Sequence, residues 1–427
     1  MKKTFFIALM TLCSWGASAQ KYVGGDISLL PKYEQAGSQY YDREGAAVTS
    51  PLSFFKQQGM NAMRLRLFVD PSANTGVDKD DNVCQDLDYV KTLGRRIKDA
   101  GFRLMLDFHY SDTWADPGKQ WTPAAWVGLS DAQLQTKLYD YTKDVLEQMK
   151  AAGAEPDMIQ TGNEISYGML WGTRAAVGGT NNGTNRCWPS SSSANWNRFT
   201  ELLRLATKAC REVCPEAKII IHTERTSVSQ QSDNKAYAAL DNFYGKMKAA
   251  QIDYDIIGLS YYPYFHGPVS ELEGAVSLLE KNYSDKKIMV VEFGYPYAWE
   301  VGGTTYKYTA TYPYSEEGQR ALTADVVKML NSHKNVNGLF WWWMEYNAKG
   351  TSLGGWYNAP LFDSRSGRAT AALYELKNFS DATSSVATIV SDTNGEDGPW
   401  YTIDGRIVEH PAEGLYIHNH KKVILRK

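Results

Sequence analysis

The chain has 427 residues, a length that fits one (β/α)8 barrel with a small extension as well as two or three average domains. Hydrophobic residues make up 43% and charged residues 22%, so the chain can bury a large core and is not generally disordered. The formal net charge is -3 and no basic cluster precedes the last ten residues. This balance argues against a nucleic acid as ligand and favours a neutral one.

The first residues have the pattern of a cleaved export signal. Two lysines follow the initiator methionine, an apolar run over 5–15 is too short to cross a bilayer, and Ala17 and Ala19 supply small residues before a cleavage site. We expect residues 1–19 to be removed and the mature chain to be exported, to the periplasm, the cell surface or the medium. No later apolar stretch reaches about 18 residues, so we expect a soluble protein without a transmembrane segment.

Four cysteines follow the predicted signal peptide. Their spacing matches no zinc ribbon or finger. In an exported protein one or two disulfides are permitted, with three connectivities for a fully paired set, and free buried thiols are the alternative. The four are Cys84, Cys187, Cys210 and Cys214.

From residue 22 to about 380, short apolar runs rich in β-branched residues alternate with amphipathic helical runs. Ser130 and Gln133 form a capping box at the start of one predicted helix. Eight such repeats predict a parallel sheet closed into a (β/α)8 TIM barrel. An open doubly wound sheet is the alternative, but Gly24 and Gly25 do not form the glycine-rich phosphate loop that it usually carries. In chain order, the expected strands are 22–25, 62–68, 103–108, 157–161, 218–221, 256–260, 288–291 and 338–342, and the expected helices are 86–100, 130–151, 196–213, 234–250, 270–282 and 317–332.

The alternation of predicted strands and helices stops near residue 380. We assign residues 20–380 to the barrel and predict a linker over 381–398, which is rich in Ser, Thr, Asp, Asn and Gly. Residues 399–427 are expected to form a short β-rich tail module with turns at 404–405 and 413–414. This module is too small to be a robust independent domain.

Two carboxylates end predicted strands, Glu164 after the fourth and Glu292 after the seventh. In a barrel these positions lie at the carboxyl end, where catalytic groups gather, and on opposite sides of the mouth. Each one alone is more often a solvated or salt-bridged cap. As a pair beside Asn163 they predict a glycosidase, in which one carboxyl group stays protonated for the leaving oxygen and the other is ionised.

Charged and polar residues on neighbouring strands support this interpretation. Arg64 and Arg66 alternate with apolar residues, so both guanidinium groups point into the barrel. One of them could hold Glu292 ionised, or either could form a structural ion pair with Asp107 or another barrel carboxylate. His109 follows the third strand as a hydrogen-bond donor to substrate or as a satisfied buried histidine, and no histidine spacing indicates a metal site.

Aromatic residues are abundant, with 13 Trp and 27 Tyr, and many follow the predicted strands. Core packing accounts for some of them, particularly in the run 341–343. Because these loops share one end of the barrel, we also expect stacking platforms for a chain of sugars. The candidates are Trp114, Trp121, Trp126, Tyr167, Trp171, Tyr261, Tyr262, Phe265, Tyr295, Trp299, Trp341, Trp342 and Trp343.

Taken together, these motifs resemble glycoside hydrolase family 53, the endo-β-1,4-galactanases of the retaining (β/α)8 clan. The resemblance covers residues 23 to about 379, and its fourteen-residue match at 107–120 is the most specific part. It implies Glu164 as acid/base and Glu292 as nucleophile, cleaving inside β-1,4-galactan of pectic arabinogalactan. The other matching segments are 64–67, 162–165, 168–171, 258–264, 266–267, 291–292 and 295–296.

The resemblance also implies a set of substrate-binding or supporting residues, without a catalytic metal or cofactor, in a protein that we expect to be monomeric. Many bacterial members carry an acidic calcium-binding loop after the seventh strand, whereas residues 300–313 are here mostly Gly, Thr and Tyr. The tail similarly resembles the C-terminal sorting modules of exported Bacteroidetes proteins. The supporting set is Asn163, Arg64, Arg66, Asp107, His109, Asp112, Trp114, Asp116, Trp171, Tyr262, His266 and Trp343.

Two alternatives stay open at this point. A hydrolase acting on another β-glycan, such as mannan or xylan, uses the same pair of glutamates. A catalytically silent galactan-binding surface protein keeps the aromatic platform but has no need of Glu164 and Glu292. Residues 178–195 in the fourth-strand loop either reshape outer subsites or form a tolerated surface insertion.

Overall fold

The computed structural model describes residues 20–174, 185–188, 191–230, 235–347, 349, 359–379, 399–402, 407–408, 411, 414–418 and 421–425. The predicted signal peptide and the predicted linker lie outside these residues. The chain divides into two compact units, residues 1–382 and 383–427. No helix among the described residues is both long enough and apolar enough to cross a membrane.

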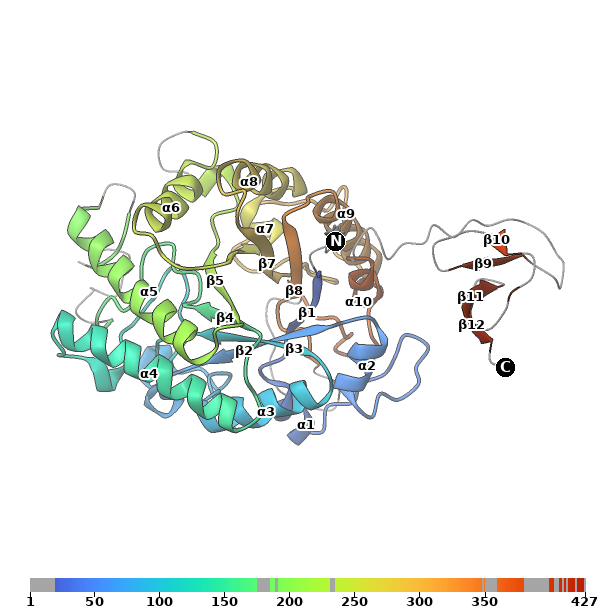
Figure 1. Cartoon of the computed structure of the whole chain (residues 1–427), viewed down its shortest axis with the longest axis horizontal. Coiled ribbons are helices and arrows are strands. Elements are labelled where there is room, and N and C mark those ends of the chain that lie inside the picture. The colour runs from blue at the N-terminus through green and yellow to red at the C-terminus, as the bar shows by residue number, and fades with distance from the viewer. Residues whose placement is uncertain are drawn as a thin grey trace, which may run out of the picture. The chain divides into compact units, whose positions relative to one another are not determined.

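The first unit is a closed barrel of eight parallel strands in sequence order, with β1 paired to both β2 and β8. Helices surround the strands as an outer ring (Figure 1). The predicted TIM barrel is confirmed, because each helix returns the chain so that the next strand pairs in parallel with the last. The strands are β1 (Tyr22–Asp26), β2 (Ala62–Leu67), β3 (Arg103–Phe108), β4 (Met158–Thr161), β5 (Lys218–Thr223), β6 (Ile256–Tyr261), β7 (Lys287–Phe293) and β8 (Val336–Trp341).

The helices have the caps that their sequences favour. Ser130 and Gln133 form the expected capping box on α4, and the Asp86 side chain accepts the backbone N–H of Tyr89 at the start of α3. Neither of the two helices between β1 and β2 was predicted, although Ser50 caps the second of them and Pro51 begins it. The helices are α1 (Leu30–Gln35), α2 (Pro51–Gln57), α3 (Leu87–Asp99), α4 (Asp131–Ala151), α5 (Ser193–Val213), α6 (Ala238–Ala249), α7 (Pro263–His266), α8 (Val269–Asn282), α9 (Glu316–Asn331) and α10 (Ala371–Glu375).

The barrel interior changes from apolar to polar along the strands. Its apolar layer includes Ala62, Met105 and Ile220, from β2, β3 and β5. Two residues further along the same strands, the side chains on that face are Arg64, Asp107 and His222, all fully buried. Polar side chains therefore accumulate at the carboxyl end of the barrel, where the functional groups are expected.

A β-bulge in β7 interrupts this alternation. Leu259 of β6 pairs with Val290, but Ser260 pairs with Glu292, so Val291 has no opposite residue. Strict alternation would place Glu292 on the same face as Val290, which packs toward the helices. The extra residue instead turns Glu292 into the barrel, because a bulge changes the direction of the side chains that follow it.

The second unit contains a four-stranded antiparallel sheet in the order β10-β9-β11-β12. It agrees with the predicted β-rich tail, except that Gly414 begins a strand instead of closing a turn. The other predicted turn, at 404–405, lies outside the described residues. The strands are β9 (Trp400–Thr402), β10 (Ile407–Val408), β11 (Gly414–His418) and β12 (Lys421–Leu425).

The four cysteines that follow the predicted signal peptide are free thiols. Cys187, Cys210 and Cys214 are buried, and burial raises the pKa of each thiol. The sequence left disulfides and free thiols open as alternatives, and in the structure these cysteines are free thiols.

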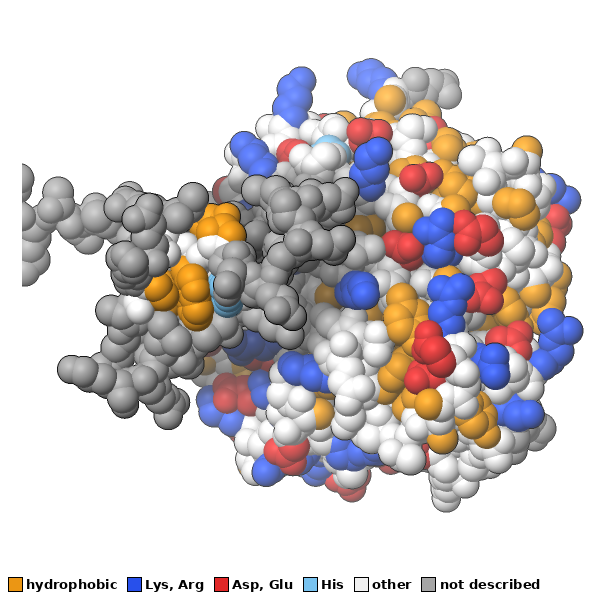
Figure 2. Space-filling model, turned by 90° about the vertical axis from the view of Figure 1, so that its right-hand side faces the viewer, with side chains coloured by type: hydrophobic (Ala, Val, Ile, Leu, Met, Phe, Trp, Pro, Cys, Tyr) orange, Lys and Arg blue, Asp and Glu red, His pale blue; other side chains and the backbone are white. Residues whose placement is uncertain are grey.

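Acidic and basic side chains are interspersed on the barrel unit. Figure 2 shows red and blue side chains mixed over the face that it draws in colour. Many of them pair with each other, as Arg96 does with Glu34 and Arg211 with Asp253. This mixture agrees with the small net charge of the sequence.

Candidate active site

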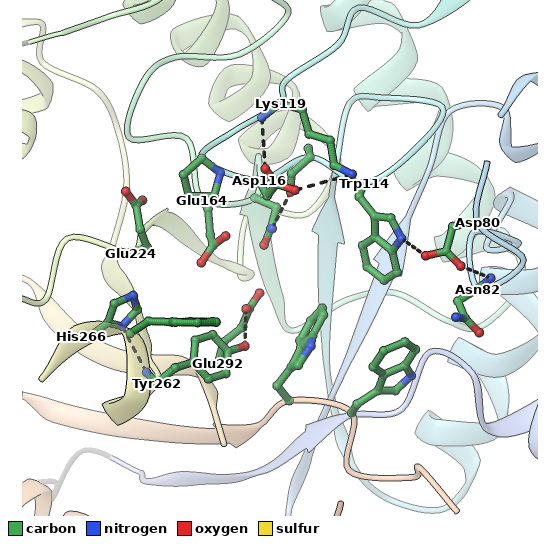
Figure 3. A pocket seen from close by; sticks show the side chains of 16 residues that line it. Asp80, Asn82, Trp114, Asp116, Lys119, Glu164, Glu224, Tyr262, His266 and Glu292 are labelled. Carbon is green, nitrogen blue, oxygen red and sulfur yellow. Dashed lines mark hydrogen bonds and ion pairs between the residues drawn. The ribbon is translucent and has the colours of Figure 1, made fainter. Parts of the chain in front are cut away.

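A cleft of about 510 Å³ opens at the carboxyl end of the barrel. Glu164 and Glu292 both line it, and Figure 3 shows their carboxyl groups in its middle part. The structure thus brings together the two glutamates that the sequence placed on opposite sides of the barrel mouth. The full lining comprises Asp80, Asn82, Trp114, Ala115, Asp116, Pro117, Lys119, Asn163, Glu164, Glu224, Tyr262, Phe265, His266, Glu292, Trp342 and Trp343.

Glu292 is held by two donors. Arg64 Nη2 donates to its Oε1 at 3.0 Å, and the Tyr262 hydroxyl donates to its Oε2 at 2.7 Å. Burial raises the pKa of Glu292 to about 7, while the charge of Arg64 and the hydrogen bond from Tyr262 oppose this rise. Both contacts favour the ionised carboxylate, and its fixed orientation suits attack on an atom in the cleft.

Glu164 has a different environment. Its backbone has a φ of 45°, in the left-handed region that costs a residue with a Cβ about 1 kcal/mol. Ser260 Oγ donates to Glu164 Oε1 at 2.6 Å. Burial and the negative charges of Glu292 and Glu224 raise the pKa of Glu164 well above its ordinary value. Glu164 is therefore the group of the pair that retains a proton.

A hydrogen-bond chain fixes which oxygen of Glu164 carries that proton. The Glu164 backbone N–H donates to His222 Nδ1 at 3.3 Å, and burial lowers the pKa of His222 well below its ordinary value, so the ring is neutral. Ser260 Oγ lies 2.9 Å from Nε2 of the same ring. Because Ser260 in turn donates to Oε1, the acidic proton belongs on Oε2.

The two arginines of β2 share Asp26 as a partner, and Arg64 has three others. Arg64 Nη2 contacts Asp107 Oδ2 at 2.7 Å and Asn163 Oδ1 at 2.8 Å, in addition to Glu292. Arg66 Nη1 pairs with Asp26 Oδ1 at 2.8 Å. The two alternatives for these arginines thus coexist, because Arg64 contacts both Glu292 and Asp107, whereas Arg66 forms its ion pair with Asp26.

His109 is buried and is not among the described residues that line the cleft. Ala115 N–H donates to its Nδ1 at 3.0 Å, and its Nε2 lies 3.2 Å from Asp107 Oδ2. Burial lowers the pKa of His109, so the ring is neutral. Asn163 Nδ2 donates to the Ala115 carbonyl at 2.8 Å, which connects the third-strand loop to the fourth. The position agrees with the satisfied buried histidine, the second of the alternatives for His109.

The two aspartates of the third-strand loop differ in position. Asp112 is nearly buried and accepts the backbone N–H groups of Asp70 and Ala124, so it joins two loops without reaching the cleft. Asp116 lines the cleft and accepts the backbone N–H groups of Gly118 and Lys119. Burial raises the pKa of Asp116.

The predicted aromatic platform is only partly in the cleft. Trp114, Trp342 and Trp343 line it, and the guanidinium group of Arg66 lies 4.8 to 5.5 Å from their ring centroids. Trp341 is core, as expected for part of the run 341–343. Trp171 is also buried, against Trp121 and Arg186, and is outside the described cleft lining.

Glu224 is a cleft residue that the sequence interpretation missed. It follows β5, and only 6% of its surface is exposed. The predicted strand ended at Ile221, but β5 continues to Thr223. Ile220 and His222 face the barrel interior, so the same two-residue alternation would have predicted Glu224 as the next inward side chain.

Comparison with known proteins decides the family. The family model described as glycosyl hydrolase family 53 matches residues 22–376. The chain belongs to glycosyl hydrolase family 53. An arabinogalactan endo-β-1,4-galactanase of Thermothelomyces thermophilus is 30% identical over 366 residues, which are 83% of this chain and 98% of that protein. An endo-β-1,4-galactanase of Bacillus subtilis is 30% identical over 328 residues, 75% of this chain and 68% of that protein.

The fold agrees with this membership. The solved catalytic domain of a family 53 protein from Ignisphaera aggregans aligns with a TM-score of 0.68 and 30% sequence identity. The alignment covers 86% of this chain and 98% of that domain. Within the family 53 barrel, the cleft with Glu164 and Glu292 is therefore the region where a glycosidase site is expected.

The calcium loop found in many family 53 members does not fit the residues present here. Calcium takes six to eight oxygen ligands, mostly from carboxylates and carbonyls. Glu300 is the one carboxylate between residues 300 and 313, and it pairs with Lys307 at 2.6 Å. Nor do the described residues include a group of three or more His, Cys, Asp or Glu side chains arranged for a metal ion.

Proposed function

We propose that this chain hydrolyses internal β-1,4-galactosidic bonds of galactan, the side chain of pectic arabinogalactan, with retention of configuration at the anomeric carbon. The names of the Thermothelomyces and Bacillus relatives support galactan as the substrate. One structural observation carries the proposed mechanism. Two glutamates face one cleft; Arg64 and Tyr262 donate to Glu292 and favour its ionised form, whereas burial and two neighbouring carboxylates favour the protonated form of Glu164.

In this mechanism Glu292 is the nucleophile and Glu164 is the acid/base. A carboxylate oxygen of Glu292 attacks the anomeric carbon while the bond from that carbon to the glycosidic oxygen breaks. Glu164 donates its proton to the leaving oxygen, and a covalent galactosyl-enzyme ester forms. Arg64 and Tyr262 support this step, because they hold Glu292 ionised and oriented.

The second step uses Glu164 as a base. Once Glu292 is esterified, its negative charge is gone, and one cause of the raised pKa of Glu164 disappears. Glu164 then accepts a proton from a water molecule, whose oxygen attacks the anomeric carbon and releases Glu292. Two inversions at one carbon give net retention.

Replacing either glutamate by glutamine tests these roles. We expect Glu164→Gln and Glu292→Gln each to lower kcat/KM on linear β-1,4-galactan by about 10³-fold or more, because each removes a proton donor or a nucleophile. Binding of galactotetraose, measured by calorimetry, should be largely retained. Glu273→Gln, an exposed position on α8, is the matched control. Activity of either active-site variant within tenfold of the parent would refute the assignment.

Azide separates the two roles. In Glu164→Ala, an aryl β-galactobioside needs no proton donor to form the galactosyl-enzyme, and azide then attacks without a base. The galactobiosyl group is transferred from the enzyme to azide, so the expected product is a β-galactobiosyl azide, identified by NMR. In Glu292→Ala no galactosyl-enzyme forms, so the same azide of retained configuration should not appear.

A product profile tests the substrate. Linear galactan is compared with mannan, xylan and cellulose, and galacto-oligosaccharides of several lengths indicate an endo-acting enzyme. Faster cleavage of mannan or xylan would favour the other β-glycan hydrolases, and binding without cleavage would favour a silent galactan-binding protein.

We further propose that the chain is exported after removal of residues 1–19 and acts outside the cytoplasm as a monomer. The charged start, the apolar run and the small residues before Gln20 support export. A polymeric substrate that cannot enter a cell is consistent with that location.

A further inference from the structure

Glu224 has a position in the cleft that the proposed mechanism does not use. In Figure 3 it lies with His266 on one side of the Glu164–Glu292 pair, whereas Trp114, Asp80 and Asn82 lie on the other. The cleft therefore has two chemically different ends. One carries a carboxylate and an imidazole, and the other carries an indole with an aspartate and an asparagine.

The Glu224 carboxylate is fixed from two sides. Its Oε2 accepts a hydrogen bond from the Ser166 hydroxyl, and its Oε1 lies 3.5 Å from Arg225 Nε. Ser166 comes two residues after Glu164, so this contact ties Glu224 to the loop that carries the acid/base. A carboxylate has about four acceptor directions, so a carboxylate at the cleft surface with these two partners still has capacity for a ligand hydroxyl.

His266 supplies a donor at the same end. The Tyr262 backbone N–H donates to His266 Nδ1 at 3.1 Å. Burial lowers the pKa of His266 to about 3, so the ring is neutral and Nε2 carries the hydrogen. An acceptor and a donor at one end of a cleft match a sugar hydroxyl, which both donates and accepts.

The position of the proposed acid/base, Glu164, indicates which sugar binds at the end of the cleft that carries Glu224 and His266. An acid/base must lie beside the leaving oxygen, on the side from which the leaving sugar departs. The charge of Glu224 acts on Glu164, whereas the charges that act most on Glu292 are those of Arg64, Asp107 and Asp26. Glu224 thus belongs to the acid side of the cleft, and the indoles belong to the side of the sugar that is attacked.

We propose that Glu224 and His266 form the subsite for the leaving-group galactose, with Glu224 accepting a hydrogen bond from a hydroxyl of that sugar. This inference rests on the proposed function. It makes Glu224 a determinant of which sugar leaves, in addition to any electrostatic effect on Glu164.

Two substrates that differ only in their leaving group test the subsite. Galactotetraose places a sugar over Glu224, whereas 4-nitrophenyl β-galactobioside places there an aryl group without a hydroxyl. We expect Glu224→Gln and Glu224→Ala to lower kcat/KM on galactotetraose by about 10- to 100-fold, the range for a lost hydrogen bond to a charged group. On the aryl substrate both variants should stay within about threefold of the parent, as should Glu273→Gln on either substrate.

Galactosyl transfer provides a second readout. The aryl substrate forms the galactosyl-enzyme, and galactobiose then competes with water for it, its hydroxyl oxygen attacking the anomeric carbon while its proton goes to Glu164. The acceptor uses the same subsite, so Glu224→Gln should lower the ratio of transfer to hydrolysis about tenfold. This ratio is an internal comparison and does not depend on how much of a variant folds.

The possible results of these experiments distinguish failure of the proposed subsite from failure of the proposed function. Equal losses on both substrates, with the alkaline limb of the pH profile shifted, would show that Glu224 acts only through the charge it places near Glu164, and would overturn the subsite. Unchanged kinetics on both substrates would overturn it as well. If the parent cleaved neither substrate, the proposed function itself would fail.

Discussion

Two different chemical groups donate hydrogen bonds to Glu292, the proposed nucleophile. Arg64 is a permanent charge, but it is shared among Asp26, Asp107 and Glu292. Tyr262 is neutral and donates its hydroxyl hydrogen to one oxygen of Glu292. Arg64 balances the negative charge of this buried set of carboxylates. The hydrogen bond from Tyr262, in contrast, can be removed by mutation without changing the net charge inside the barrel.

Removing the Tyr262 hydroxyl should shift the pH dependence of the reaction. The hydrogen bond favours the ionised form of Glu292, so its loss raises the pKa of Glu292. Because Glu292 must be ionised to react, Tyr262→Phe should move the acidic limb of kcat/KM upward by about one pH unit. A pH profile on galactotetraose measures this shift.

Tyr312→Phe is the matched control, since the Tyr312 hydroxyl donates to Asp325 at 2.7 Å, outside the cleft lining. Its acidic limb should coincide with that of the parent. A Tyr262→Phe profile with an unchanged or lowered acidic limb would contradict the role given to this hydroxyl.

Sequence reasoning found Glu164 and Glu292 because both follow apolar strand-like runs. It missed Glu224 because the predicted strand was two residues too short, although the alternation from Ile220 through His222 leads to it. It also gave Trp171 as a stacking candidate and as a substrate-binding or supporting residue, and that ring is buried against Trp121 and Arg186. Whether a loop indole faces solvent or core depends on neighbouring loops, which local periodicity does not describe.

At the scale of elements, strand ends were predicted to within a few residues, but the bulge in β7 was not. Alternation alone would place Glu292 toward the helices, whereas the unpaired Val291 turns it inward. A bulge depends on the register between two strands that are distant in sequence. The prediction that Glu292 lies at the barrel mouth therefore came from its position at a strand end, not from its face.

The contact between the first two strands requires a glycine. A Cβ on Gly24 would lie 1.7 Å from the carbonyl oxygen of Ala62, its neighbour in β2. Neither backbone can move without breaking the barrel ladder. Gly24→Ala should therefore lower the free energy of unfolding by about 3 kcal/mol, as measured by urea denaturation.

Gly302 offers the comparison, because a Cβ there meets no atom within 4 Å and its φ is not in the left-handed region. Gly302→Ala should change the free energy of unfolding by less than about 1 kcal/mol. A Gly24→Ala variant as stable as Gly302→Ala would mean that β1 and β2 adjust their separation.

At the scale of the whole molecule, the barrel was predictable because eight apolar runs alternate with helices at nearly even intervals. Each repeat supports the same answer, so small errors at single boundaries did not matter. The family resemblance agreed with it over nearly the same residues. Disulfide pairing was different, because spacing alone does not decide whether two thiols meet.

The division of the chain into two units predicts that catalysis needs only the first. All described residues that line the cleft lie before residue 382. A chain ending at Ala382 should hydrolyse linear galactan with a kcat/KM within about twofold of the full chain, because it keeps every described residue that lines the cleft. A loss greater than tenfold, with an unchanged unfolding midpoint, would show that the second unit contributes to the reaction on the polymer.

The closure of the barrel has a consequence for biosynthesis. Arg66 is anchored to Asp26 of β1 and lies beneath Trp342 and Trp343, which follow β8. The floor of the cleft thus joins the earliest and the latest parts of the barrel to be made. A chain that lacks its eighth strand has no complete cleft, so hydrolytic activity should appear only when the whole barrel has folded and should not grow gradually with chain length.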